Sequence, residues 1–199
     1  YDLAGFSVGV LDGDKKNSKS SIIKNGDLLI GLESSGVHSN GYSLIRKILN
    51  DKKIKLDDKI KGGSGTIGSY LLKPTKIYVN PILELFKKDI IKSVAHITGG
   101  GITENLPRIL NKKFTANIDL DSWNLSPLYK WIMSNNISEN EMLKTFNCGH
   151  GMIIVADKKK LRAIEMVLKK HKIKLKVIGY ISSKNNFNKK DIKYSGSLK

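Results

Sequence analysis

The feature that most constrains the fold is a pair of polar, glycine-broken loops, residues 34–41 and 96–101. The first reads Ser-Ser-Gly-Val-His-Ser-Asn-Gly and the second reads His-Ile-Thr-Gly-Gly-Gly. Each follows an apolar run typical of a strand and leads into the apolar periodicity of a helix. A glycine loop between a strand and a helix presents backbone N–H groups to an anion. The loops therefore predict a strand-and-helix domain with an anion-binding edge.

Apolar runs and helical periodicities alternate along the rest of the chain. Strands are predicted over 5–10, 27–32, 90–97, 114–120, 152–156 and 176–181. Helices are predicted over 41–50, 81–88, 101–110, 127–133, 139–146 and 158–170. The charged, glycine-rich stretch 51–68 is predicted to be a surface loop, and the tail after residue 182 to add only an edge strand. This alternation favours an α/β layered domain.

Length and cysteine usage limit the class of protein. With 199 residues, 40% of them hydrophobic, the chain is long enough for one domain with a sizeable core. Cys148 is the only cysteine, so an internal disulfide and a cysteine-based zinc site are excluded, and a cytoplasmic protein is predicted. No apolar run approaches the roughly 18 residues of a membrane span, so no membrane partner is expected. Because the chain opens on Tyr1, we expect residues 1–199 to be one domain of a longer protein.

The net charge of +17 raises nucleic acid as a partner, because clustered basic residues release counterions from phosphates. The basic residues are mostly lysines scattered through the chain. No arginine-rich stripe, aromatic platform or known reading motif accompanies them. Solvated lysine-rich faces are therefore favoured, and no nucleic-acid partner is expected. A basic nucleic-acid-binding domain stays as the non-enzymatic alternative.

The glycine run 99–101 is a candidate phosphate site, because three glycines before a helix allow close backbone approach to an anion. A purely structural turn is the alternative. Thr98 adds a hydroxyl donor beside the run. Asn105 and Arg108 are expected to project from the first turns of the following helix, where the Arg108 guanidinium suits a phosphate or a carboxylate. Arg108 is equally well explained as a surface residue.

Two histidines lie in or beside these loops. His38 stands among small polar residues, where an imidazole polarises an oxygen or moves a proton near neutral pH, although a loop histidine is more often merely exposed. Asn40 suits recognition of an amide or amidine, but an Asn before a Gly is also a common turn pair. His96 is either a core histidine or a site residue. The sequence offers no metal-ligand spacing and no Walker A motif.

Five segments, in the same order, resemble the phosphoribosylformylglycinamidine cyclo-ligases, also called aminoimidazole ribonucleotide synthetases. The segments are 1–6, 34–44, 74–79, 96–108 and 146–152. The similarity extends from Tyr1 to about Ile181. Val37 stands where a proline or another apolar residue is expected, and His150 stands where the family usually has a small aliphatic residue. His150 is therefore either a modifier of the pocket edge or a solvent-facing residue.

This resemblance implies an α/β (α+β) fold, a three-layer α/β/α domain with a mixed sheet. Related domains occur in selenophosphate synthetase, thiamine-phosphate kinase and the formylglycinamidine-forming amidotransferase. It implies ATP-dependent cyclisation of formylglycinamidine ribonucleotide to aminoimidazole ribonucleotide, with release of ADP and phosphate, in purine biosynthesis. An N-terminal domain would hold ATP and Mg²⁺ and form a homodimer, so this C-terminal part is expected to be inactive alone. A sister enzyme of the same ATP-using superfamily is the enzymatic alternative.

The resemblance also implies which residues act. His38 and His96 would be catalytic. The substrate-binding residues, all on the two loops or the helix that follows the second, would be Ser35, Gly36, Ser39, Asn40, Thr98, Gly99, Gly100, Gly101, Asn105 and Arg108. Both loops are candidates for the phosphates.

Overall fold

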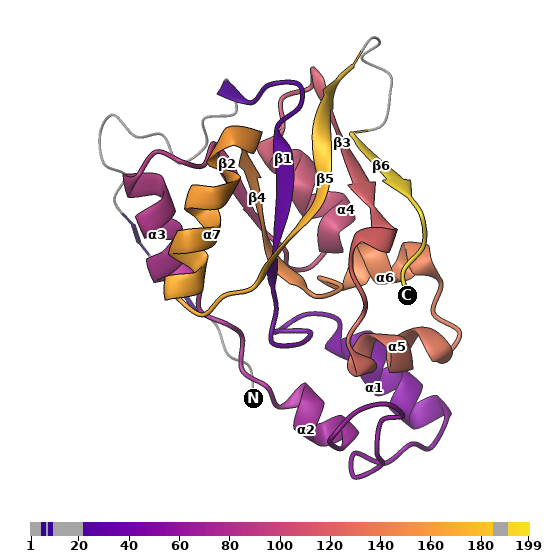
Figure 1. Cartoon of the computed structure of the whole chain (residues 1–199). Coiled ribbons are helices and arrows are strands. Elements are labelled where there is room, and N and C mark those ends of the chain that lie inside the picture. Colours follow the sequence, from indigo (N-terminus) through magenta and orange to yellow (C-terminus); the bar gives the residue numbers. More distant parts are fainter. Residues whose placement is uncertain (1–4, 7, 10–21, 185–190) are drawn as a thin grey trace.

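The described part of the chain is built on one mixed sheet. The structure, a computed structural model, describes residues 5, 6, 8, 9, 22–184 and 191–199. The strands are β1 (Leu28–Glu33), β2 (Ser93–His96), β3 (Phe114–Asp119), β4 (His150–Ala156), β5 (Leu175–Ser183) and β6 (Ile192–Ser195). Their order in the sheet is β2-β4-β1-β5-β3-β6 (Figure 1). Neighbours pair antiparallel except β3 and β6, which are parallel. β1 therefore lies inside the sheet, between β4 and β5.

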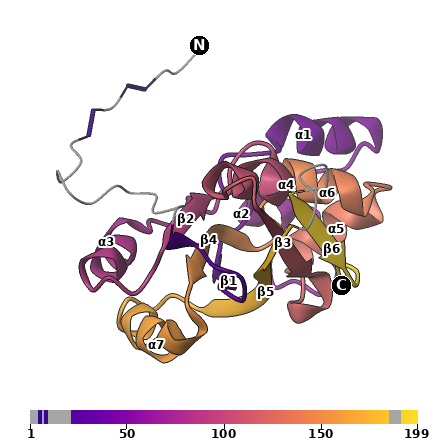
Figure 2. The ribbon, with the colours of Figure 1, turned by 90° about the horizontal axis from the view of Figure 1, so that it is seen from above.

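Helices cover both faces of this sheet. The α-helices are α1 (Tyr42–Asp51), α2 (Ile67–Leu71), α3 (Val79–Lys87), α4 (Gly101–Asn105), α5 (Pro127–Ser134), α6 (Glu139–Thr145) and α7 (Leu161–Lys170). Seen from above, α3 and α7 lie on one side of the sheet, and α1, α4, α5 and α6 on the other (Figure 2). The expected three-layer α/β/α domain with a mixed sheet is confirmed.

The central strands show why two helical layers are needed. Successive strand side chains point to opposite faces. Leu29 accordingly packs into the core beneath α1, α4, α5 and α6, whereas Ile30 and Leu32 pack into the core beneath α3 and α7. In β4, Ile153 and Ile154 divide between the two cores in the same way. Because each fully buried aliphatic side chain contributes about 1.5–3 kcal/mol, neither face of the sheet is stable uncovered.

Most predicted elements occur with small shifts at their ends, and the chain tail does form an edge strand, β6. The predicted strand 90–97 shortens to β2. Of the predicted strand 5–10, residues 7 and 10 lie outside the described residues, and residues 5, 6, 8 and 9 lie in no strand. The predicted helix 158–170 begins as a 3-10 turn, Lys158–Lys160, where the Asp157 carboxylate accepts the Lys159 N–H.

Two predicted elements need correction. The stretch 51–68 is not loop throughout, because its end forms the start of α2, where the Thr66 hydroxyl accepts the Ser69 N–H. Ile60 and Ile67 are buried there and anchor the charged stretch to the core. The predicted helix 101–110 is divided: α4 ends at Asn105, and the chain continues as the 3-10 helix Leu106–Ile109. Local periodicity does not reveal either change.

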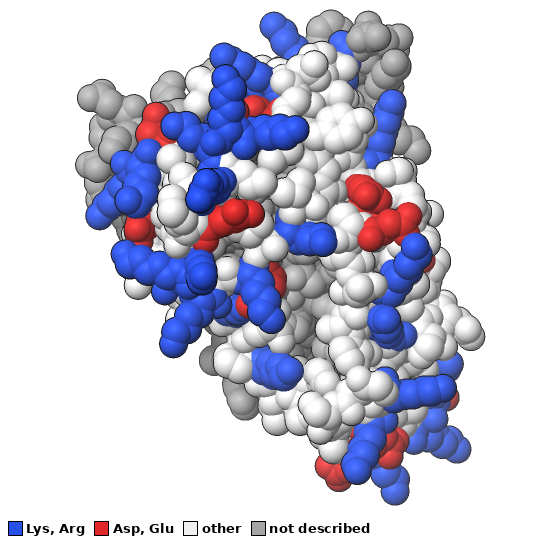
Figure 3. Space-filling model, viewed as in Figure 1, with Lys and Arg blue, Asp and Glu red and all other residues white. Residues whose placement is uncertain are grey.

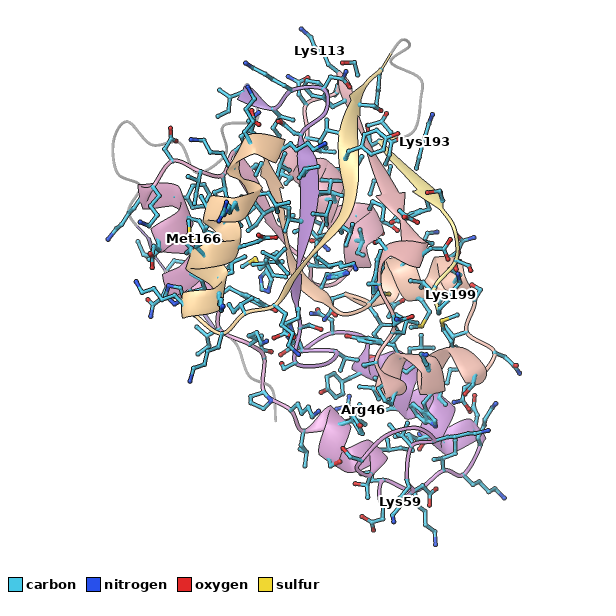
Figure 4. The ribbon with its side chains drawn as sticks, viewed as in Figure 1. Arg46, Lys59, Lys113, Met166, Lys193 and Lys199 are labelled. Atoms are coloured by element: carbon cyan, nitrogen blue, oxygen red, sulfur yellow. The ribbon has the colours of Figure 1, made fainter. Side chains whose placement is uncertain are left out.

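Charge is distributed over the surface. On the face shown in Figure 3, Lys and Arg side chains spread over several elements, with Asp and Glu between them. Lys59, Lys113, Lys193 and Lys199 mark widely separated places on the outline of the molecule (Figure 4). This face has the mixed character of a solvated surface. Among the described residues, no helix combines the length and the apolar character needed to cross a membrane.

Candidate functional site

The two predicted glycine loops and a third glycine turn meet at one end of the sheet. β1 and β2 both pair antiparallel with β4. The carboxyl ends of β1 and β2 therefore lie beside the amino end of β4. This brings together residues 34–41 after β1, 97–100 after β2 and 146–149 before β4. The strands thus place both loops on one side of the fold, as a shared ligand site requires.

A single amide, that of Asn147, ties the first loop to the third. Its Oδ1 accepts hydrogen bonds from the Ser34 hydroxyl at 2.9 Å, the Tyr129 hydroxyl at 2.6 Å and the Gly149 N–H at 2.9 Å. Its Nδ2 donates to the Gly36 carbonyl at 3.0 Å. The network holds the backbone of Gly36 in place. Since Gly36 is a predicted substrate-binding residue, Asn147 helps to shape the proposed site. The sequence does not reveal this role, because an Asn beside a glycine turn is usually explained by the turn itself.

His38 is buried, with 4% of its surface exposed, and has a left-handed backbone, φ 57°. Its Nε2 lies 3.2 Å from the Ser35 backbone nitrogen and accepts that N–H. Nδ1 must then carry the proton of the neutral ring, and it has no partner among the described residues. Burial, followed by the nearby His96 and Lys76, lowers the pKa of His38 to about 4. The ring is therefore neutral, its Nδ1–H is enclosed by the protein, and its surroundings disfavour proton uptake near neutral pH.

The segment 74–78 crosses the first loop. The Ser35 hydroxyl donates to the Pro74 carbonyl at 2.6 Å, and the hydroxyls of Ser39 and Thr75 lie 3.4 Å apart. The Tyr78 hydroxyl donates to the carbonyl of Glu33, at the end of β1, at 2.7 Å. This segment was matched by the family resemblance but was given no role there. Its contacts make it a third component of the site.

The two glycine loops face one another through Asn40 and Gly99. A methyl group placed on Gly99 would lie 3.7 Å from the Asn40 Oδ1, in ordinary van der Waals contact. Gly99 and Ser39 are exposed, and Asn40, Thr98 and Gly100 are partly exposed. The accessible face of the site is therefore made by both loops.

The predicted residues after the second loop have different surroundings. Asn105 is buried, and its Nδ2 donates to the carbonyls of Gly99 at 3.0 Å and Gly101 at 2.8 Å, so it holds the loop from inside. Gly101 is also buried, with φ 58° and the backbone of Leu143 against it. Arg108 is exposed and forms no ion pair or hydrogen bond with the described residues. The structure therefore does not bring Arg108 together with the loops.

A groove of about 470 Å³ opens beside the loops. His96 from the end of β2, with Thr75 and Lys76, lines its polar end. Ile77, Leu83 and other apolar residues line the remainder. His96 is exposed, although partial burial lowers its pKa. His96 is thus an accessible imidazole, in contrast to His38.

A second, smaller pocket of about 310 Å³ is lined by residues 33–36, and Lys73, Asn124 and Ser126 also contribute to its wall. The described residues include no group of three or more His, Cys, Asp or Glu side chains that could hold a metal ion. The groups that the described site can offer to a ligand are backbone N–H groups, hydroxyls, imidazoles and lysine ammonium groups.

His150, the departure from the family pattern, is buried. Its ring contacts the Trp123 ring edge to face at 4.7 Å between centroids and covers Gly31 of β1. Neither ring nitrogen has a hydrogen-bond partner among the described residues. Burial lowers the pKa of His150 to about 4. His150 therefore belongs to the core and does not face solvent.

The buried His150 predicts acid sensitivity. Since its pKa falls from 6.5 to about 4 on folding, the unfolded chain binds the proton first as pH decreases. The free energy of unfolding therefore decreases as the pH falls from 6.5 to 4, and His150 does not affect it above pH 6.5. The contribution of His150 to this decrease is about 3 kcal/mol. Replacing His150 with leucine should remove this share. Urea unfolding of parent and variant at pH 7 and pH 4.5 measures the difference, and parallel losses in both proteins would refute the assignment.

Comparison with known proteins gives concordant results. The sequence model for the family described as "AIR synthase related protein, C-terminal domain" matches residues 24–191. A phosphoribosylformylglycinamidine cyclo-ligase of Bacillus cytotoxicus is 47% identical over 181 residues, covering 90% of this chain and 52% of that protein. A trifunctional purine biosynthetic protein adenosine-3 of Bos taurus is 40% identical, over 91% of this chain and 18% of that protein. The motif-based resemblance is confirmed.

The chain spans about half the length of the cyclo-ligases that it matches. Among solved structures, a thiamine-monophosphate kinase of Stenotrophomonas maltophilia superposes with a TM-score of 0.60. The two are 15% identical, and the match covers 89% of this chain and 52% of that one. At this identity the likeness concerns the fold alone. It agrees with the expected occurrence of this fold in thiamine-phosphate kinase.

Proposed function

The chain belongs to the family described as AIR synthase related protein, C-terminal domain, and from this premise we propose its function. On this premise it is the substrate-side part of an enzyme that converts formylglycinamidine ribonucleotide to aminoimidazole ribonucleotide. The identity of 47% to a protein bearing the cyclo-ligase name supports this choice over the sister reactions. The same assignment makes the whole protein an ATP-dependent ligase of purine biosynthesis.

The chemistry proposed for the site is activation of a poor leaving oxygen. ATP, when bound, supplies the phosphoryl group that is transferred to the formyl oxygen of the substrate. The amidine nitrogen then attacks the formyl carbon, the carbon–oxygen bond breaks, phosphate leaves with its electron pair, and loss of a proton completes the imidazole. ADP and phosphate are the other products. This chain's task is to hold the formyl amide and the anionic groups in position while these bonds change.

The position of the Asn40 amide next to Gly99 carries the proposal, because it places the two loops on one accessible face. We assign to His38 the positioning of the first loop beside the reacting groups, through its Nε2 acceptor for the Ser35 N–H, and we assign His96 as the accessible imidazole near it. The remaining proposed ligand groups are those of Ser35, Gly36, Ser39, Asn40, Thr98, Gly99 and Gly100. Asn105 and Gly101 would act by shaping the second loop. Arg108 is proposed to contact the substrate only in the complete enzyme, where the bound substrate would have to extend to it.

The missing half of the enzyme is proposed to supply the rest. ATP and Mg²⁺ would be held mainly by an N-terminal domain, which would also form the homodimer, and the complete protein would be cytoplasmic. The cattle relative, of which the match covers only 18%, is an example of this domain within a longer chain. Neither nucleic acid nor a membrane is a proposed partner.

The decisive experiment is ATP-dependent formation of aminoimidazole ribonucleotide by the full-length gene product. We expect product at enzymatic rates from the complete protein and none from residues 1–199 alone. If the complete protein folds and binds ATP but forms no product, the cyclo-ligase assignment fails. The sister substrates would then be assayed with the same preparation.

A further inference from the structure

The segment that crosses the first loop carries a cation without an assigned role, Lys76. Its side chain lines the polar end of the 470 Å³ groove together with Thr75 and His96. Its positive charge contributes to the lowered pKa of the buried His38. Lys76 therefore lies among the residues of the site, although it comes from a segment outside both glycine loops.

The ammonium group of Lys76 is held by an ion pair. Nζ lies 2.8 Å from Oε1 of Glu33, the last residue of β1. The Lys76 side chain is 24% exposed and that of Glu33 34% exposed, so both charged groups are partly accessible to solvent. An ammonium has three donors, and one carboxylate oxygen satisfies only one of them. Lys76 is thus positioned by the protein with hydrogen-bonding capacity left over.

Arg108, the cation expected from sequence, lacks this setting. It is exposed on the 3-10 helix after α4 and does not line the groove. Thr75, the chain neighbour of Lys76, lines the same groove, and its hydroxyl lies 3.4 Å from that of Ser39, so two rotatable donors are available there. A tetrahedral oxyanion is recognised by such a combination of one fixed charge and several donors.

We infer that Lys76, with His96 and the Ser39–Thr75 hydroxyl pair, forms a phosphoryl-binding site at the polar end of the groove. This inference deepens the proposed function and rests on it for the identity of the natural ligand. The phosphoryl group is either the 5′-phosphate of the ribonucleotide substrate or a phosphate derived from ATP. Glu33 acts as the counter-charge that positions Lys76 and limits its affinity for anions.

Binding is tested on residues 1–199 with two probes, ribose 5-phosphate and pyrophosphate, at constant ionic strength. Amide chemical shifts of Ser39, Asn40, Thr98 and Gly99 report the titration. We expect saturable shifts for at least one probe. Preference for ribose 5-phosphate identifies the substrate phosphate as the natural group, and preference for pyrophosphate identifies a phosphate from ATP.

Three variants are expected to change the affinity for the preferred probe differently. Lys76→Met should weaken binding of the preferred probe about 10-fold or more, because a charge-assisted hydrogen bond is lost. Glu33→Gln should strengthen it several-fold by removing the competing carboxylate. Lys113→Met, the matched control, should leave it within about 2-fold, because Lys113 is exposed just before β3, at the opposite end of the sheet from the loop that follows β1. Amide spectra of each variant verify folding.

The inference is overturned if the parent shows no saturable shifts, if Lys76→Met binds like the parent, or if Lys113→Met loses as much affinity as Lys76→Met. These outcomes concern binding by this chain alone. The turnover assay of the full-length protein tests the cyclo-ligase assignment separately, so a failure of either proposal leaves the other measurable.

Discussion

Replacing Gly101 with alanine is expected to lower the free energy of unfolding by about 3 kcal/mol or more. The backbone of Gly101 is left-handed, φ 58°, which costs an L-residue roughly 1–2 kcal/mol. An added Cβ would also overlap the carbonyl oxygen of Leu143 in α6 and lie 2.8 Å from its carbonyl carbon. Because these are backbone atoms, α4 and α6 would have to separate, at a further cost of about 1–3 kcal/mol.

Gly99→Ala is the matched control for this change. It adds the same methyl group two residues earlier, where the nearest atom is the Asn40 Oδ1 at 3.7 Å and the residue is exposed. Its stability should stay within about 1 kcal/mol of the parent. Urea unfolding of the two variants measures the contrast. Equal stability of Gly101→Ala and Gly99→Ala would show that the packing of α4 against α6 is not as described.

The second large effect concerns His38 in the full-length enzyme, and it rests on the proposed function. His38→Ala is expected to reduce turnover about 100-fold, because it removes the acceptor of the Ser35 N–H and lets the loop shift from its working position. His38→Gln should lose less than about 10-fold, since its amide oxygen can still accept this N–H. Both replacements place an L-residue on the same left-handed backbone, so any backbone strain is common to both, and their difference in turnover reports the side chain.

Proton transfer by His38 would give a different pattern. Neither alanine nor glutamine takes up a proton near neutral pH, so both variants would then fall equally. The pH dependence of kcat/KM offers an independent reading: with a pKa of about 4, His38 should contribute no inflection between pH 6 and pH 9. Imidazole nitrogen shifts of this chain should report a neutral ring protonated at Nδ1. An equal loss in both variants, or protonation at Nε2, would contradict the assignment.

Much of the fold is predictable because the relevant signals are local. The apolar run of β1 and the helical face of α1 can be read from a few neighbouring residues, and the glycines between them mark the turn. The second loop, before α4, was located in the same way. These signals establish both loops and their order along the chain, and the antiparallel pairing of β1 and β2 with β4 then places them together.

The remainder depends on contacts between distant segments. Small polar neighbours make exposure of His38 the commoner expectation, but the ring lies inward, where it accepts the Ser35 N–H and packs over Gly151, which has no side chain in its way. Asn105 was expected to project toward a ligand, yet the shortness of α4 turns its amide back onto the loop carbonyls. Lys76 reaches the site only because 74–78 crosses the first loop, a path that no local pattern encodes.

The central position of β1 also governs how the domain is made. Its partners β4 and β5 begin at His150 and Leu175, so the strand leaves the ribosome long before either neighbour exists. At roughly 5–20 residues per second, synthesis of the intervening chain takes on the order of ten seconds. Throughout that interval a strongly apolar strand has two unpaired edges, which invite association with other nascent chains. A strand that is paired on both edges in the finished domain is therefore open to association on both edges while the protein is being synthesised.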